Sequence, residues 1–219
     1  MFRRLLIRQL GHPSGPFGRW LLRSVYNKSN ALNIRRALEA LGVEAHHQVL
    51  DIGFGGGLSL AELAPRLSAG GCAHGIDRSA DAIDVARRRF ATEIDAGRID
   101  VRLGDVGAIP FEAATFDRAC TINTVYFWPD LRAAFAEVAR VLRPGARFTV
   151  CFSSPESMRA SWWTRRDMLT PSADEVADAL RAAGFDVLTT ALTDEDAEFD
   201  SVVVTGVRTA AEPTPRRST

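Results

Sequence analysis

Lysine is almost absent from this chain, long apolar runs are missing, and the charges of the two signs cancel. Lys28 is the only lysine among 27 basic residues, and 27 acidic residues bring the formal net charge to zero. A molecule without net charge has no bulk attraction for nucleic acid or for an anionic membrane, so any charged surface must be local. No stretch approaches the roughly 18 consecutive apolar residues of a membrane span, and we therefore expect no stable membrane insertion.

Cysteine is scarce as well, and its distribution argues against disulfides. Cys72, Cys120 and Cys151 are odd in number and far apart, and the last two lie in apolar runs typical of strands. This pattern predicts buried free thiols in a cytoplasmic protein. Of the histidines, only His46 and His47 are neighbours, and no cysteine spacing accompanies them, so the sequence predicts no metal site.

The length and the segment boundaries predict one main domain. The chain has 219 residues, of which 46% are hydrophobic, enough for one sizeable α/β domain. We place that domain at residues 48–209, after an N-terminal helical cap at residues 1–47 and before a disordered tail at residues 210–219. The first forty residues hold eight basic side chains and one acidic one, so a solvated basic face is the alternative to a cap. Nothing in the sequence indicates the oligomeric state.

One stretch carries the strongest chemical signal. An apolar run at residues 49–52 ends in Gly53, Phe54 and three more glycines at positions 55–57, and helix-forming sequence follows. This order predicts a strand, a tight turn and the start of a helix. Glycine is used where φ must be positive or where a ligand approaches the backbone, so we expect a ligand against this turn. An ordinary turn with spare glycines is the plainer alternative.

Spacing separates the nucleotide-binding loops that compete for this stretch. The dinucleotide pattern G-x-G-x-x-G would need glycine at position 58 or 60, where the chain has Leu58 and Leu60. A phosphate-binding loop needs a lysine followed by serine or threonine, and Lys28 lies elsewhere. These two absences disfavour an NAD(P)-dependent oxidoreductase and a phosphate loop.

The arrangement that fits is an acid followed by alternating glycines. Asp51, Gly53, Gly55 and Gly57 resemble the first motif of the class I S-adenosylmethionine-dependent methyltransferases. The resemblance implies S-adenosylmethionine as cofactor and S-adenosylhomocysteine as product. We assign Phe54, between the glycines, to the same cofactor site.

Two more carboxylates follow strands. Asp77 ends a short apolar run 24 positions after Gly53, near the roughly 20 expected of an acid that binds ribose hydroxyls. It could also cap the next helix, but Ser79 is available for that role, and we assign Asp77 and Arg78 to the cofactor.

A third acid, Asp105, follows the strand expected from Ile99. In the family that the chain resembles, such an acid accepts from the adenine amino group and the next backbone amide contacts the ring. We therefore assign Gly104, Asp105 and Val106 to the cofactor as well.

The fourth expected strand leads into an aromatic cluster at residues 123–128. Ligands of open α/β sheets bind beyond the carboxyl ends of the strands where the strand order reverses, so Asn123 should lie at the cofactor site. The helix, turn and strand at residues 129–152 resemble small-molecule methyltransferases, including enzymes that methylate quinone rings. Residues 153–170 are bulky and irregular, and we expect a substrate lid there.

The C-terminal pattern completes the expected fold class. One helix precedes two consecutive strands joined by an acidic turn, which predicts an antiparallel hairpin. The fold class is α/β, with a Rossmann-like, doubly wound, seven-stranded sheet. The sheet should be mostly parallel with an antiparallel C-terminal hairpin strand, and helices should cover both faces.

The resemblance implies methyl transfer by in-line displacement to a small, largely apolar or aromatic acceptor. Alignment and exclusion of water supply most of the catalysis, so a dedicated base is not obligatory. His12 and Tyr126 are the tentative candidates for such a base. A protein that binds S-adenosylmethionine without catalysis is the main alternative, and the sequence indicates no nucleic-acid partner.

Overall fold

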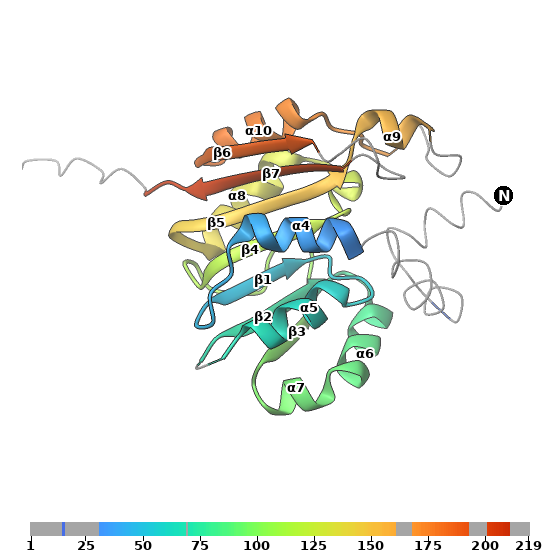
Figure 1. Ribbon diagram of the computed structural model, residues 1–219, viewed down its shortest axis with the longest axis vertical. Helices are drawn as coiled ribbons and strands as arrows, with labels where there is room; N and C mark the ends of the chain where they lie inside the picture. The colour runs from blue at the N-terminus through green and yellow to red at the C-terminus, as the bar shows by residue number, and fades with distance from the viewer. Residues whose placement is uncertain (1–14, 16–30, 69, 161–167, 193–200, 211–219) are drawn as a thin grey trace, which may run out of the picture.

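The computed structural model describes residue 15 and residues 31–68, 70–160, 168–192 and 201–210, and the account below concerns these residues. They form a single seven-stranded sheet (Figure 1). Its strands are β1 (Gln48–Ile52), β2 (Cys72–Asp77), β3 (Ile99–Leu103), β4 (Phe116–Ile122), β5 (Leu142–Ser153), β6 (Phe185–Leu192) and β7 (Ser201–Arg208). Their spatial order is β3-β2-β1-β4-β5-β7-β6, with β3 and β6 at the two edges.

The strand directions confirm the predicted mixed sheet. β1 pairs in parallel with β2 on one side and with β4 on the other, and the parallel pairing continues to β3 and β5. β7 runs antiparallel to both β5 and β6, which confirms the predicted C-terminal hairpin. Because β1 lies between β2 and β4, the chain reverses its direction of travel across the sheet at this point. Such a reversal leaves an open crevice beyond the carboxyl ends of the two strands.

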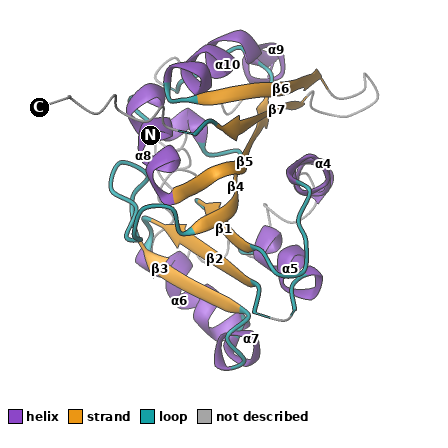
Figure 2. Ribbon diagram, turned by 90° about the vertical axis from the view of Figure 1, so that its left-hand side faces the viewer, coloured by secondary structure: helices purple, strands orange, loops and turns teal. Residues whose placement is uncertain are grey.

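Helices cover both faces of the sheet. They are α4 (Ala31–Leu41), α5 (Leu58–Leu63), α6 (Ala80–Arg89), α7 (Ala91–Asp95), α8 (Leu131–Val141), α9 (Pro155–Ala160) and α10 (Ala173–Ala182), with 3-10 turns η1 (Ala64–Arg66) and η2 (Val125–Phe127). α4 and α5 lie on one side of the sheet and α8 on the other (Figure 2). Side chains of α4, α5 and α6 enter one apolar core, and those of α8 and α10 enter the second.

β1 shows how the sequence supports two cores. Consecutive side chains of a strand point to opposite faces, and Val49 enters the core beneath α4 while Leu50 enters the core beneath α8. Both residues are fully buried. A strand buried on both faces needs an uninterrupted apolar run instead of an alternating one, which explains the sequence that precedes the glycines.

Helix α4 belongs to the segment expected to form an N-terminal cap, but it packs on the sheet. Ile34, Leu38 and Leu41 are buried, and the helix contacts β5, β4 and β7. Gly42 follows with φ of 63°, the left-handed conformation that ends a helix. The remainder of residues 1–47 before α4 lies outside the described residues, except Gly15.

Two further expectations concern the C-terminal half. Residues 153–170 were expected to be irregular, whereas residues 155–160 form α9, because the Ser154 hydroxyl accepts from the Ser157 amide at 3.1 Å and caps the first turn. Residues 161–167 and nearly all of the expected tail, residues 211–219, lie outside the described residues. Among the described helices, none is long and apolar enough to cross a membrane.

The second core predicts a large stability effect at Phe148. Its ring is fully buried and packs edge-on against Phe135, with centroids 5.5 Å apart. Phe148→Ala should lower the free energy of unfolding by about 3 to 5 kcal/mol, measured by urea denaturation. Leu188→Ala is the matched control, since Leu188 is 55% exposed on the edge strand β6 and should change stability little. Equal losses in the two variants would contradict this packing.

Candidate active site

A cavity of about 270 Å³ opens at the carboxyl ends of β1, β2 and β4, where the strand order reverses. The cofactor residues assigned from the sequence come from four separate segments, and all except Gly57 line this cavity. They are Asp51, Gly53, Phe54, Gly55, Asp77, Arg78, Gly104, Asp105, Val106 and Asn123. The fold thus gathers at one place residues that the sequence separates by as many as 72 positions, from Asp51 to Asn123.

The glycine turn needs its glycines for geometric reasons. Gly53, Gly55 and Gly57 have φ of 75°, 53° and 74°. Such left-handed values are accessible to glycine without steric cost. A Cβ at Gly53 would also lie 2.6 Å from Cγ2 of Thr124. Gly57, which does not line the cavity, has a different constraint, because a Cβ there would lie 2.8 Å from the Phe90 ring.

Asp77 holds the glycine turn in place. Its Oδ2 accepts a hydrogen bond from the Gly55 amide at 3.0 Å, and its Oδ1 accepts from the Ser79 amide at 2.8 Å. Ser79 caps α6 through its own hydroxyl, which accepts from the Ala82 amide at 3.3 Å. The helix cap is therefore Ser79, as the sequence suggested. Asp77 thus fixes both the glycine turn and the start of α6, and its carboxylate lines the cavity.

Asp51 is a buried acid at the end of β1. It is 1% exposed, and its Oδ2 accepts a hydrogen bond from the Ser59 hydroxyl. Burial, together with the nearby charge of Asp77, raises the pKa of Asp51 to about 7 against the opposing effect of the Ser59 bond. Its charge therefore changes within the physiological pH range.

Gly104, Asp105 and Val106 follow the carboxyl end of β3 and line the cavity there. Asp105 is exposed, and its Oδ1 accepts from the Gly107 amide at 2.9 Å, which forms a tight turn. Val106 is buried and offers an apolar surface to the cavity. Gly104 leaves room for Pro110, whose Cδ would lie 2.8 Å from a Cβ at that position.

Comparisons with known proteins agree with this site. Residues 49–145 match the family model described as a methyltransferase domain. The chain is 34% identical over 148 residues to the O-methyltransferase cnsE of Penicillium expansum, which covers 64% of this chain and 52% of that protein. It is 32% identical over 178 residues to the nocamycin O-methyltransferase of Saccharothrix syringae, covering 69% and 63%. The chain belongs to the class I S-adenosylmethionine-dependent methyltransferases.

Solved methyltransferases share the fold. The S-adenosylmethionine-dependent methyltransferase from Aquifex aeolicus superposes with a TM-score of 0.72 at 19% identity, covering 86% of this chain and 97% of that one. A geranyl diphosphate methyltransferase in complex with S-adenosylmethionine gives 0.69 at 20% identity, covering 91% and 94%. At these identities the likeness concerns the fold. The chain spans little more than half of the length of cnsE, so its activity and acceptor are treated below as proposals.

The cavity has an aromatic and apolar side that the sequence located only in part. Phe127 and Trp128 line it at the end of β4, as the aromatic cluster indicated, and Trp128 is also anchored in the core against Phe135 at 5.9 Å. Thr124 and Ile34 line it too and were not assigned. Thr124 could have been assigned to the cavity from the sequence, because it follows the expected end of β4. Nothing local marks Ile34, because α4 reaches the cavity only through its packing on the sheet.

The two residues predicted from the sequence as tentative bases, His12 and Tyr126, are placed very differently. His12 lies outside the described residues. Tyr126 is buried beside the cavity, and its hydroxyl donates to Oδ1 of Asn123 at 2.9 Å and accepts from the Ser153 amide. Burial raises the pKa of the Tyr126 phenol above its ordinary value. Both assignments stay predictions, and the occupied hydroxyl and raised pKa argue against Tyr126 as a base.

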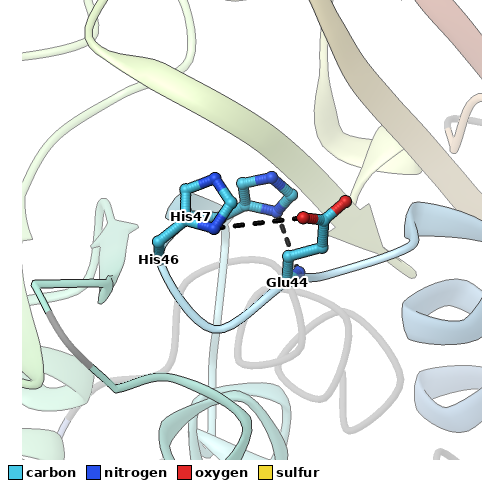
Figure 3. A group of neighbouring side chains, drawn as sticks. All are labelled: Glu44, His46 and His47. Atoms are coloured by element: carbon cyan, nitrogen blue, oxygen red, sulfur yellow. Dashed lines mark hydrogen bonds and ion pairs between the residues drawn. The ribbon is translucent and has the colours of Figure 1, made fainter.

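A cluster of possible metal ligands lies at the other end of β1 (Figure 3). His46 Nδ1 lies 3.9 Å from a carboxylate oxygen of Glu44, and His47 Nδ1 accepts from the Glu44 amide at 2.9 Å. Burial lowers the pKa of His47, and in the neutral ring Nε2 then carries the proton. A metal would need the Nδ1 lone pair that the amide occupies. The geometry is that of a hydrogen-bonded turn leading into β1.

Asp51 predicts a pH-dependent contribution to stability. Its pKa is about 7 in the folded state against 3.8 ordinarily, so between these values the folded state holds a proton that the unfolded state has lost. The free energy of unfolding contributed by Asp51 therefore falls as pH rises from about 4 to about 7 and is constant above. Asp51→Asn removes this titration, so urea denaturation should show the variant gaining stability relative to the wild type across that window. A difference that does not change with pH would contradict the buried, uncharged Asp51.

Proposed function

We propose that this chain transfers the methyl group of S-adenosylmethionine to a small, largely apolar or aromatic acceptor by in-line displacement. The observation that carries the proposal is the division of one cavity into two sides. Carboxylates of Asp51, Asp77 and Asp105 lie on the side of β1, β2 and β3, and the apolar groups of Ile34 and Phe127 lie on the other. The first side suits a cation with hydroxyl and amino donors, and the second suits an apolar acceptor.

The residues present fit S-adenosylmethionine without rearrangement. Asp77 lines the cavity with a carboxylate, the group that accepts hydrogen bonds from ribose hydroxyls, and also holds the glycine turn. Asp105 offers a free carboxylate oxygen to the adenine amino group, and Val106 offers an apolar surface to the ring. The sulfonium, when bound, supplies an already activated methyl donor. The work left to the protein is to align the acceptor and exclude water, worth on the order of 7 to 11 kcal/mol when positioning is good.

The N-terminal segment supports a closed site. The Gly15 amide donates to Oδ2 of Asp81 at 2.6 Å, which brings residue 15 to the first turn of α6, directly after Asp77 and Ser79. Gly15 itself therefore lies near the end of the sheet at which the cavity opens. This supports the cap predicted for the N-terminal region and the exclusion of water that the reaction requires.

Titration calorimetry followed by a transfer assay tests the proposed function. S-adenosylhomocysteine should bind and NAD should not, because the glycine spacing and Asp77 suit the former. Tritium-labelled S-adenosylmethionine should then methylate at least one member of a panel of small phenols, amines and quinones. Binding without any transfer would favour a non-catalytic binding protein. Binding of NAD without a response to S-adenosylhomocysteine would overturn the proposal altogether.

Asp77 should contribute directly to cofactor affinity. Asp77→Ala leaves ribose hydroxyls and the Gly55 amide unpaired, so the affinity for S-adenosylhomocysteine should fall by about 1 to 3 kcal/mol, measured by calorimetry. Asp84→Ala is the matched control, because Asp84 is an exposed acid on the same helix, α6, that Asp77 precedes. If the affinity of Asp77→Ala is unchanged while its melting temperature drops, the residue acts only on the fold.

A further inference from the structure

An arginine at the surface contacts the glycine turn from outside the cavity. Nη1 of Arg89, the last residue of α6, donates to the Gly56 carbonyl at 2.8 Å. Arg89 is exposed and does not line the cavity, whereas Gly56 does. The hydrogen bond joins residues that lie 33 positions apart in the chain, and it attaches a surface side chain to the turn at the cofactor site.

Phe90 restricts where the Arg89 side chain can lie. The Phe90 ring is buried and packs so close to Gly57 that a Cβ there would lie 2.8 Å from it. The Arg89 guanidinium lies over the same ring, 5.0 Å from its centroid. Because a cation is attracted to the face of an aromatic ring, this contact limits the positions that an otherwise exposed arginine would sample. The guanidinium is thus kept beside the glycine turn.

The turn is attached to the protein at the two ends of α6. Before the helix, Asp77 accepts from the Gly55 amide at 3.0 Å, and at its last residue Arg89 donates to the Gly56 carbonyl. Glycine has the widest choice of backbone conformations, so a run of glycines loses the most entropy when a ligand orders it. A turn that is already held at two places loses less entropy on binding, and the ligand therefore binds more tightly.

One peptide group of the turn is held on both of its sides. It joins Gly56 to Gly57, and Arg89 binds its carbonyl while its N–H donates to the Phe54 carbonyl at 2.9 Å. The oxygen of this group therefore points to a side chain outside the cavity. A peptide group between two glycines can turn over easily, since neither neighbour has a Cβ. Without Arg89, the oxygen would no longer be kept on the outer side of the turn.

The Gly56 amide is the donor that the turn leaves for a ligand. Gly56 lines the cavity, and no described residue accepts a hydrogen bond from its N–H. The strand order β3-β2-β1 places the turn beyond Asp105 and Asp77, which the sequence assigns to adenine and ribose. A cofactor bound in that order brings its amino-acid end to the turn. The carboxylate at that end can only accept hydrogen bonds, so it complements a backbone amide.

We propose that Arg89 is a positioning residue of the cofactor site. Through its bond to the Gly56 carbonyl, it keeps the glycine turn in the conformation that presents the Gly56 amide to the carboxylate of S-adenosylmethionine. Arg89 itself does not touch the cofactor and acts only through the turn. The inference concerns cofactor binding alone, so it goes beyond the proposed function and is independent of which acceptor is methylated.

Arg89→Met tests the inference by removing the donors of the guanidinium. Methionine keeps an unbranched side chain that packs favourably against an aromatic ring, so the contact with Phe90 is retained in part. The affinity for S-adenosylhomocysteine, measured by calorimetry, should fall about three- to tenfold, because a charge-assisted hydrogen bond is lost at an exposed position. Arg88→Met is the matched control and should change the affinity less than about twofold. Arg88 is also exposed on α6 and makes no hydrogen bond or ion pair with a described residue.

Two further measurements separate positioning from a general effect on stability. Methylthioadenosine keeps the adenine, ribose and sulfur of S-adenosylhomocysteine but lacks its amino-acid end, so Arg89→Met should weaken its binding less than about twofold. Arg89→Lys keeps a cationic donor on a flexible stem and should recover part of the affinity for S-adenosylhomocysteine that Arg89→Met loses. A merely structural role of Arg89 predicts a lower melting temperature and equal losses for the two ligands.

Each way in which the inference can fail has its own result. If Arg89→Met binds S-adenosylhomocysteine as tightly as Arg88→Met does, the inference is wrong and the proposed function is unaffected. Equal weakening of both ligands, or no recovery in Arg89→Lys, also overturns it. A wild-type protein that binds S-adenosylhomocysteine but methylates no acceptor would refute catalysis and leave the role of Arg89 standing. If the wild type binds no S-adenosylhomocysteine, both proposals fall.

Discussion

The site depends on a topological constraint of the sheet. β1 lies between β2 and β4 in the sheet. From β1 the chain continues to β2 on one side, and from β4 it continues to β5 on the other side, so the two connections diverge beyond the carboxyl ends of β1 and β4. None of the described helices crosses that point, and the crevice between the two connections becomes the cavity. The groups assigned to the cofactor stand at or after the carboxyl ends of β1, β2, β3 and β4. A change in strand order would disperse them, even if each strand kept its sequence.

The conformation of the glycine turn and the position of Asp77 depend on each other, because the Asp77 carboxylate accepts a hydrogen bond from the turn. The turn needs left-handed backbone at Gly53 and Gly55, and the Gly55 amide is held by the carboxylate that ends the neighbouring strand β2. The position of the turn is therefore set by the pairing of β1 with β2, which places Asp51 beside Gly75. Gly75 has no side chain because a Cβ would lie 2.6 Å from Phe54, another residue of the turn. The pairing of β1 with β2, the packing of Phe54 over Gly75 and the hydrogen bond from Gly55 to Asp77 therefore all hold the same turn.

The polarity of the cavity follows from what each element buries. On the β3 side, acids stand at or near the carboxyl ends of three strands: Asp51 and Asp77 are buried there, and Asp105 is exposed. On the other side, α4 and the segment after β4 bring Ile34 and Phe127, whose apolar groups continue the two cores to the surface. Asn123 and Thr124, which follow β4, add polar side chains to this wall, and the Tyr126 hydroxyl donates to Oδ1 of Asn123. Orientation of a bound molecule then depends on very few hydrogen bonds.

Local sequence was sufficient for the features that depend on neighbours in the chain. The buried strand before Gly53, the acid at Asp77 and the C-terminal hairpin all follow from apolar runs, turn residues and strand ends, which act over a few residues. The same holds for the helix cap at Ser79 and the helix end at Gly42.

Only the tertiary structure decided the features that join distant segments. Ile34 reaches the cavity because α4 packs on β5, more than a hundred residues later in the chain. The pKa of Asp51 depends on how deeply the sheet buries it, and the Asn123 amide is oriented by a tyrosine whose hydroxyl is itself held by Ser153 on the next strand. The burial of a side chain and the direction of its hydrogen bonds depend on residues that are near in space but distant in the chain. The periodicity of apolar residues along the sequence therefore does not predict them.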